Sequence, residues 1–99
     1  MIIWIRGPRK SGKTTLAKQL LERMNAVWLD GDDMRTIWPD LGFSEQDRLV
    51  NNIRVAKLAK ILEDQGHDVI VSTICPDYCK EDVFNITGCR FIELNGIIE

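Results

Sequence analysis

The 99-residue sequence has few of the residues on which disulfide-bonded and zinc-binding proteins depend. Its three cysteines are odd in number and form no Cys-x-x-Cys pair, so they do not make a disulfide framework. The single histidine, His67, does not complete a zinc site with them at a recognisable spacing. We therefore expect Cys75, Cys79 and Cys89 to be free thiols in a reducing compartment.

Long apolar runs and a strong excess of one charge are also missing. The opening apolar run, residues 2–5, is too short for a signal peptide or a membrane span, and basic residues follow it at once. The net charge is −2, which argues against a strong nucleic-acid binder. We therefore expect a cytoplasmic protein with no membrane partner and no nucleic-acid partner.

What is present fits one small α/β domain over residues 1–99. Hydrophobic residues make up 44% of the chain, enough for a core. Short apolar runs typical of buried parallel strands alternate with amphipathic stretches that predict helices. The predicted strands cover residues 2–5, 26–29, 69–74 and 91–94, and the predicted helices cover residues 16–24 and 44–66. This alternation predicts a parallel sheet with crossover helices.

The segment GPRKSGKT, residues 7–14, matches the phosphate-loop pattern G-x-x-x-x-G-K-S/T between a predicted strand and a predicted helix. Backbone N–H groups of such a loop surround a phosphate, and the helix adds the positive end of its dipole. Lys13 supplies a cation for the β- and γ-phosphates, and the Thr14 hydroxyl is placed to bind Mg²⁺. The predicted nucleotide-binding residues are Gly7, Lys10, Ser11, Gly12, Lys13, Thr14 and Thr15.

An acidic segment, DGDD at residues 30–33, follows the second predicted strand. In open parallel sheets, ligands bind at this end of the strands. A kinase needs a carboxylate near the acceptor hydroxyl, to orient it and accept its proton, and Asp32 and Asp30 are the candidates. The alternative is an ordinary polar turn after a strand.

Beyond these patterns, the chain resembles the adenylyl-sulfate kinases. Residues 29–35, LDGDDMR, are similar to the family's L-D-G-D-N-x-R, and residues 69–76, VIVSTICP, are similar to V-I-V-S-x-I-S-P. Between them, residues 41–54 resemble L-G-F-S-x-x-D-R-x-E-N-x-R-R. The resemblance implies the three-layer fold of phosphate-loop kinases with strand order 2-3-1-4. It also implies a homodimer, and a role in sulfate assimilation with ATP, Mg²⁺ and adenosine 5′-phosphosulfate.

The resemblance also implies roles for individual residues. Asp32 and Lys13 would be catalytic, and Thr14 and Asp30 would hold the metal. The implied substrate-binding residues are Arg35 and Arg48 for the phosphosulfate, Asn51 as a hydrogen-bonding group, and Phe43 and Ile74 on either side of the adenine. Two of them have alternatives: Phe43 as a hydrophobic staple before a Ser44 cap, and Arg48 as a surface residue.

The sequence departs from the family pattern at several positions. Asp33 replaces an Asn, Val50 replaces a Glu, and Ile53 replaces an Arg. The family also continues past the fourth strand with a basic lid, so we expect a domain shortened at its C-terminus. Three functions therefore stay open: an adenylyl-sulfate kinase, a degenerate nucleotide-binding relative without turnover, and a kinase for another small hydroxyl or nucleotide substrate.

Overall fold

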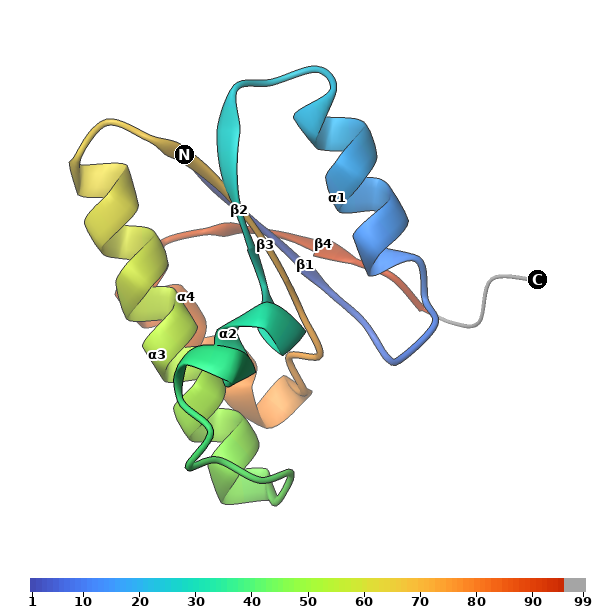
Figure 1. Cartoon of the computed structure of the whole chain (residues 1–99), viewed down its shortest axis with the longest axis vertical. Helices are drawn as coiled ribbons and strands as arrows, with labels where there is room; N and C mark the ends of the chain where they lie inside the picture. Colours follow the sequence, from blue (N-terminus) through green and yellow to red (C-terminus); the bar gives the residue numbers. More distant parts are fainter. Residues whose placement is uncertain (96–99) are drawn as a thin grey trace.

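The computed structural model describes residues 1–95 and shows alternating strands and helices (Figure 1). The strands are β1 (Ile2–Arg6), β2 (Ala26–Asp30), β3 (Asp68–Thr73) and β4 (Arg90–Glu93). The helices are α1 (Lys13–Leu21), α2 (Gly31–Ile37), α3 (Glu45–Asp64) and α4 (Asp77–Thr87). The predicted α/β class is therefore confirmed.

The strands form one parallel sheet in the order β2-β3-β1-β4, which confirms the order 2-3-1-4. The two central strands are the most apolar: Trp4 and Ile5 of β1 and Val69 to Val71 of β3 are all buried. Burial on both faces explains why these strands read as continuous apolar runs.

Helices cover both faces of this sheet and make three layers (Figure 1). Helix α1 packs on one face, where Ala17 meets Ile5 and Ile70. Helices α3 and α4 pack on the other face through Val55, Val83 and their neighbours. Helix α2 lies at the carboxyl ends of β2 and β3, so it borders the edge of the sheet where ligands bind in such folds.

Some predicted boundaries are wrong. Helix α1 ends at Leu21, three residues before Met24, and β3 ends at Thr73 rather than at residue 74. The predicted cap of the long helix is confirmed, since the Ser44 hydroxyl accepts a hydrogen bond of 3.1 Å from the Asp47 N–H. The helix itself ends at Asp64, close to the predicted stop at residue 66.

Helices α2 and α4 were not predicted. Helix α2 follows β2 without a loop, so the alternative of an ordinary polar turn at residues 30–33 is wrong. Helix α4 had sequence signals: Cys79, Val83 and Thr87 are buried at four-residue spacing, and Gly88 ends the helix in the left-handed conformation.

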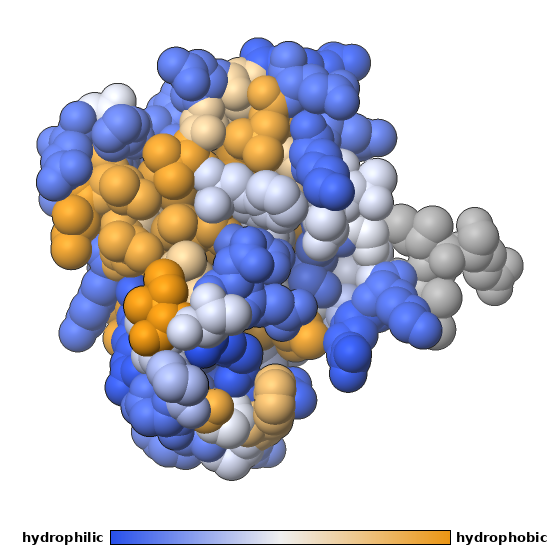
Figure 2. Space-filling model, viewed as in Figure 1, coloured by the Kyte–Doolittle hydropathy of each residue, from blue (hydrophilic) through white to orange (hydrophobic). Residues whose placement is uncertain are grey.

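Apolar side chains gather on the surface between α3 and the edge strand β2 (Figure 2). Ile61 on α3 is exposed, and Val27, Leu58 and Leu62 are half-buried beside the core. Within residues 1–95, no helix is long and apolar enough to cross a membrane.

Candidate functional site

A cavity of about 560 Å³ opens at the carboxyl ends of the strands. Every residue predicted for the site, except Gly7, lines it. The lining residues are Arg9, Lys10, Ser11, Gly12, Lys13, Thr14, Thr15, Asp30, Gly31, Asp32, Arg35, Phe43, Arg48, Asn51, Ser72, Thr73 and Ile74. We call residues 7–15 with Asp30 the donor half, and Arg35, Phe43, Arg48, Asn51 and Ile74 the acceptor half.

The backbone of the donor half is tightly turned. Gly12 caps α1 in the left-handed conformation, and Lys10 is also left-handed with φ 59°, which is uncommon for a residue other than glycine. A Cβ atom on Gly7 would lie 2.6 Å from the Leu94 carbonyl oxygen and 2.7 Å from Ser11 Oγ, so only glycine fits. Ser11 Oγ is buried without a hydrogen-bond partner among the described residues, as expected for a hydroxyl that awaits a ligand.

Lys13 lies across this loop. Its Nζ donates hydrogen bonds to the carbonyl oxygens of Gly7, at 2.9 Å, and Pro8, at 2.7 Å. Burial lowers the pKa of Lys13, and the carboxylates of Asp30 and Asp32 oppose that shift. The lysine is thus a partly desolvated cation on carbonyl groups that a phosphate can replace.

The two candidate carboxylates differ in their surroundings. Asp30 Oδ1 accepts a hydrogen bond of 2.9 Å from Ser72 Oγ, which in turn accepts one from the Trp28 indole. Asp32 is exposed in the first turn of α2, facing the same cavity. A Cβ atom on Gly31 would lie 3.0 Å from Thr73 Cγ2, so glycine lets α2 approach β3 closely.

The arginines of the acceptor half are held by backbone carbonyl groups. Arg35 Nη1 donates to the Gly42 oxygen at 2.6 Å, and Arg48 Nε donates to the Phe43 oxygen at 3.1 Å. The Arg35 guanidinium also lies 4.4 Å from the centroid of the Phe43 ring. Phe43 is 71% exposed, so it does not act as a buried staple, and Arg48 is half-buried at the cavity.

A sequence model described as adenylylsulphate kinase matches residues 1–94. The chain belongs to this family. A probable adenylyl-sulfate kinase of Archaeoglobus fulgidus is 37% identical over 93 residues, which are 83% of this chain and 60% of that protein. A cytidine diphosphoramidate kinase of Campylobacter jejuni is 42% identical over 78 residues, covering 74% of this chain and 46% of that protein.

A solved structure shows the same architecture. The APS kinase CysC of Mycobacterium tuberculosis, in complex with AMPPNP and APS, has a TM-score of 0.80 and 34% identity. The match covers 93% of this chain and 59% of that one. The chain thus spans about half to three fifths of the length of these relatives.

One set of contacts at the family site was missed by the sequence analysis. Asn52, which is 1% exposed, donates through Nδ2 to the Arg48 oxygen at 2.9 Å and the Ile74 oxygen at 3.4 Å. Its Oδ1 accepts from the Thr73 hydroxyl, which accepts from the Trp4 indole. Asn52 therefore ties two walls of the acceptor half to the core. The only sequence signal was an Asn on the buried face of α3.

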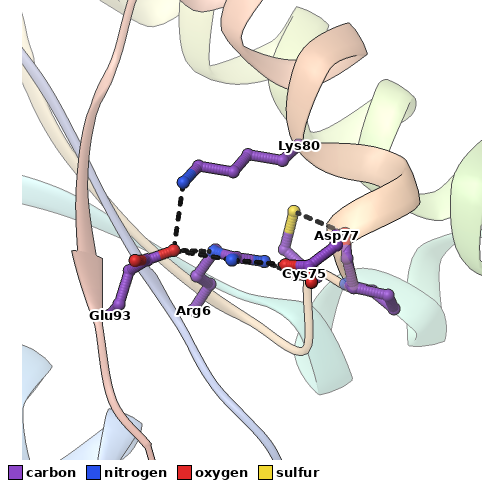
Figure 3. A network of polar contacts seen from close by, with 6 residues as sticks. Arg6, Cys75, Asp77, Lys80 and Glu93 are labelled. Carbon is purple, nitrogen blue, oxygen red and sulfur yellow. Dashed lines mark hydrogen bonds and ion pairs between the residues drawn. The ribbon is translucent and has the colours of Figure 1, made fainter.

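Arg6 was missed as well, although it directly precedes the phosphate loop. Its guanidinium donates to Glu93 Oε1, Asp77 Oδ1 and the Cys75 oxygen, each at 2.6 Å, and Lys80 also contacts Glu93 (Figure 3). Burial raises the pKa of the adjoining Cys75 thiol to about 12, so that thiol stays neutral. Arg6 joins the ends of β1 and β4 to the turn after β3. Neither the apolar run at residues 2–5 nor the loop pattern that begins at Gly7 gave a hint of these contacts.

Proposed function

We propose that this chain transfers a phosphoryl group from ATP to the 3′-hydroxyl of adenosine 5′-phosphosulfate, giving 3′-phosphoadenosine 5′-phosphosulfate for sulfate assimilation. The observation that carries the proposal is one cavity lined by a phosphate loop, two carboxylates and two arginines. A phosphate loop accounts for the nucleotide donor. Arginines near an exposed aromatic ring suit an anionic nucleotide acceptor. A guanidinium group can bind two phosphoryl or sulfuryl oxygens at once, and a purine can stack on the face of an aromatic ring.

In this proposal each residue has one task. Asp32 orients the acceptor hydroxyl and takes its proton as the new P–O bond forms and ADP leaves. Lys13 stabilises the charge on the transferred phosphoryl group. The acceptor half binds adenosine 5′-phosphosulfate. Arg35, Arg48 and Asn51 bind its phosphosulfate group, and Phe43 and Ile74 lie on either side of its adenine.

The residues of the donor half fit ATP and Mg²⁺. The Ser11 hydroxyl, which has no hydrogen-bond partner within residues 1–95, and the partly desolvated Lys13 are both suited to phosphate oxygens. Thr14 and Asp30 would hold Mg²⁺, which commonly takes one or two protein ligands and completes its shell with phosphates and water. Among the described residues, no group of three or more His, Cys, Asp or Glu side chains could hold a metal ion. When bound, Mg²⁺ neutralises charge on the phosphates.

Cytidine diphosphoramidate is a second candidate acceptor, because one relative, 42% identical to this chain, is a cytidine diphosphoramidate kinase. The diphosphoramidate in its name has two linked phosphorus centres, where adenosine 5′-phosphosulfate has one phosphorus linked to one sulfur, and the same arginines could bind the oxygens of either group. The departures at Asp33, Val50 and Ile53 lie within two residues of Arg35 or Asn51 in the sequence, although none of them lines the cavity. The third candidate, a nucleotide-binding protein without turnover, uses the donor half alone.

The test is a transfer assay with the 99-residue chain, ATP and Mg²⁺ against a panel of acceptors. We expect phosphorylation of adenosine 5′-phosphosulfate, with cytidine diphosphoramidate as the competing acceptor. ATP binding without transfer to any acceptor would favour the non-enzymatic candidate and contradict the proposal. A homodimer and a cytoplasmic location stay predictions.

A further inference from the structure

The side chain of Trp38, on the segment between α2 and α3, makes one hydrogen bond among the described residues, and its partner belongs to the acceptor half. Its indole Nε1 donates a hydrogen bond of 2.7 Å to Asn51 Oδ1. An indole N–H can only donate, so it must face the oxygen of the amide rather than the nitrogen. The contact therefore fixes which way the Asn51 amide is turned.

The other end of that amide faces the cavity. Asn51 is only 4% exposed, yet it lines the cavity, and its Nδ2 has no partner among the described residues. Among residues 1–95, Ser11 Oγ is the fully buried side-chain polar atom that lacks a hydrogen-bond partner. Asn51 Nδ2 lacks a partner too but is not in that class, so it is not fully buried. Two N–H donors are thus presented to whatever enters the acceptor half.

Trp38 is itself held in place. The Arg54 guanidinium lies 5.7 Å from the centroid of the Trp38 ring. Arg54 is paired with both carboxylate oxygens of Asp40, each at 3.1 Å. The indole also packs against the core, so its N–H has a fixed direction. This arrangement differs from a loose surface contact, which would leave the Asn51 amide free to turn over.

We propose that Trp38 is a positioning residue that sets Asn51 as a hydrogen-bond donor to an anionic oxygen of the acceptor nucleotide. Arg48 lies three residues earlier on α3 and lines the same cavity, so the two side chains share a face of the helix. Together they present donors only, which selects a phosphoryl or sulfuryl oxygen and rejects a donor group. The inference rests on the proposed function and names the residues that select the acceptor nucleotide by its anionic oxygens.

The first test replaces the indole N–H. Trp38→Phe keeps an aromatic ring but removes the donor, so the amide can turn over. We expect the KM for the acceptor to rise about 3- to 10-fold, the effect of one hydrogen bond, with the KM for ATP unchanged. Ile37→Ala alters an exposed neighbour and is the control, with both KM values unchanged. A lower Tm with an unchanged acceptor KM would show that Trp38 is only structural.

The complementary test is Asn51→Asp, which keeps an acceptor for Trp38 but replaces the NH₂ group with a carboxylate oxygen. We expect it to raise the acceptor KM by about 10- to 100-fold, more than Trp38→Phe, because donors are lost and repulsion is added. An Asn51→Asp variant that binds the acceptor as well as wild type would overturn the assignment.

A measurement without any substrate separates this inference from the proposed function. In the ligand-free chain, the Trp38 indole N–H should exchange slowly with solvent in an NMR spectrum, and Asn51→Leu should make it exchange fast. Slow exchange would support the assigned orientation even if no acceptor were phosphorylated, an outcome that contradicts only the proposed function. Equal exchange in both proteins would overturn the Trp38–Asn51 contact.

Discussion

The donor half and the acceptor half line the same cavity, but they are built in different ways. The donor half is one stretch of nine residues plus Asp30, and its shape comes from its own backbone. The acceptor half collects side chains from α2, the segment before α3, α3 itself and the residue that follows β3. Contacts between segments far apart in the sequence hold the second set in place.

Each half holds its cations on carbonyl oxygens and offers a free polar group, but with its own residues. In the donor half Lys13 donates to the Gly7 and Pro8 oxygens, and Ser11 Oγ has no partner among residues 1–95. In the acceptor half Arg35 and Arg48 donate to carbonyl groups, and the described residues offer no partner to Asn51 Nδ2. A ligand at either half gains contacts with the free group and replaces carbonyl contacts of the cations. Substitutions in one half should therefore leave binding at the other half largely unchanged, unless they reach the residues that join the two.

The largest effect should come from Lys13→Ala. It removes the cation that faces the phosphates, so we expect turnover to fall about 100- to 1,000-fold, as for the loss of a charge-stabilising group. Calorimetry should show weaker binding of ATP with Mg²⁺, while circular dichroism shows a retained fold. Lys10→Ala, a basic loop residue at the rim, is the control with a smaller effect. Unchanged ATP affinity in Lys13→Ala would contradict the assignment of the phosphate loop.

The next largest effect should come from Asn52→Leu. It removes the acceptor of the buried Thr73 O–H and the Asn52 donor to the Ile74 carbonyl, which should lower the free energy of unfolding by about 2–4 kcal/mol. Thermal unfolding measures this loss. Because Asn52 braces the acceptor half, the KM for the acceptor should rise while that for ATP does not. A loss of ATP binding alone would show that the two halves are not separate in this way.

Arg6→Met tests the junction between the halves and should cost about 1–2 kcal/mol of unfolding free energy. Arg6, then Lys80, holds the pKa of Glu93 below its ordinary value of 4.5. Glu93 therefore adds stability above pH 4.5, and that stability is lost as the pH falls through the lowered folded-state pKa. We expect the Tm difference between wild type and Arg6→Met to be largest near pH 7 and to shrink below pH 4.5. A difference that does not depend on pH would argue against the Glu93 pairing.

The smallest effect should come from Phe43→Ala. The ring is largely exposed, so the fold loses little beyond the contact with Arg35, about 0.5–1 kcal/mol. If Phe43 lies against the base of the acceptor, the acceptor KM should rise about 3- to 10-fold with an unchanged KM for ATP, since stacking contributes about 1 kcal/mol. Phe84→Ala, an exposed ring on α4, is the control. Equal acceptor KM values in Phe43→Ala and Phe84→Ala would show that Phe43 does not contact the acceptor.

Prediction from sequence succeeded where the signal was local and failed where it was not. The apolar run of β1 and the phosphate loop lie within consecutive residues, so strand, loop and helix were predictable. Helix α2 was missed because only Met34 and Ile37 of its seven residues are large and apolar, too few to show a helical period, and because it follows a strand directly. The roles of Arg6 and Asn52 were missed because their partners lie up to 87 residues away.

The sequence by itself determined the family, the alternation of strands and helices, and the phosphate loop. These depend on residue order and on backbone groups close in the chain, so they can be recognised without coordinates. Only the tertiary structure decided that Trp38 turns the Asn51 amide toward the cavity and that Asn52 braces Arg48 and Ile74. The physical reason is that a hydrogen bond fixes a side chain's direction only when both partners are held in space, and packing of the whole fold holds them.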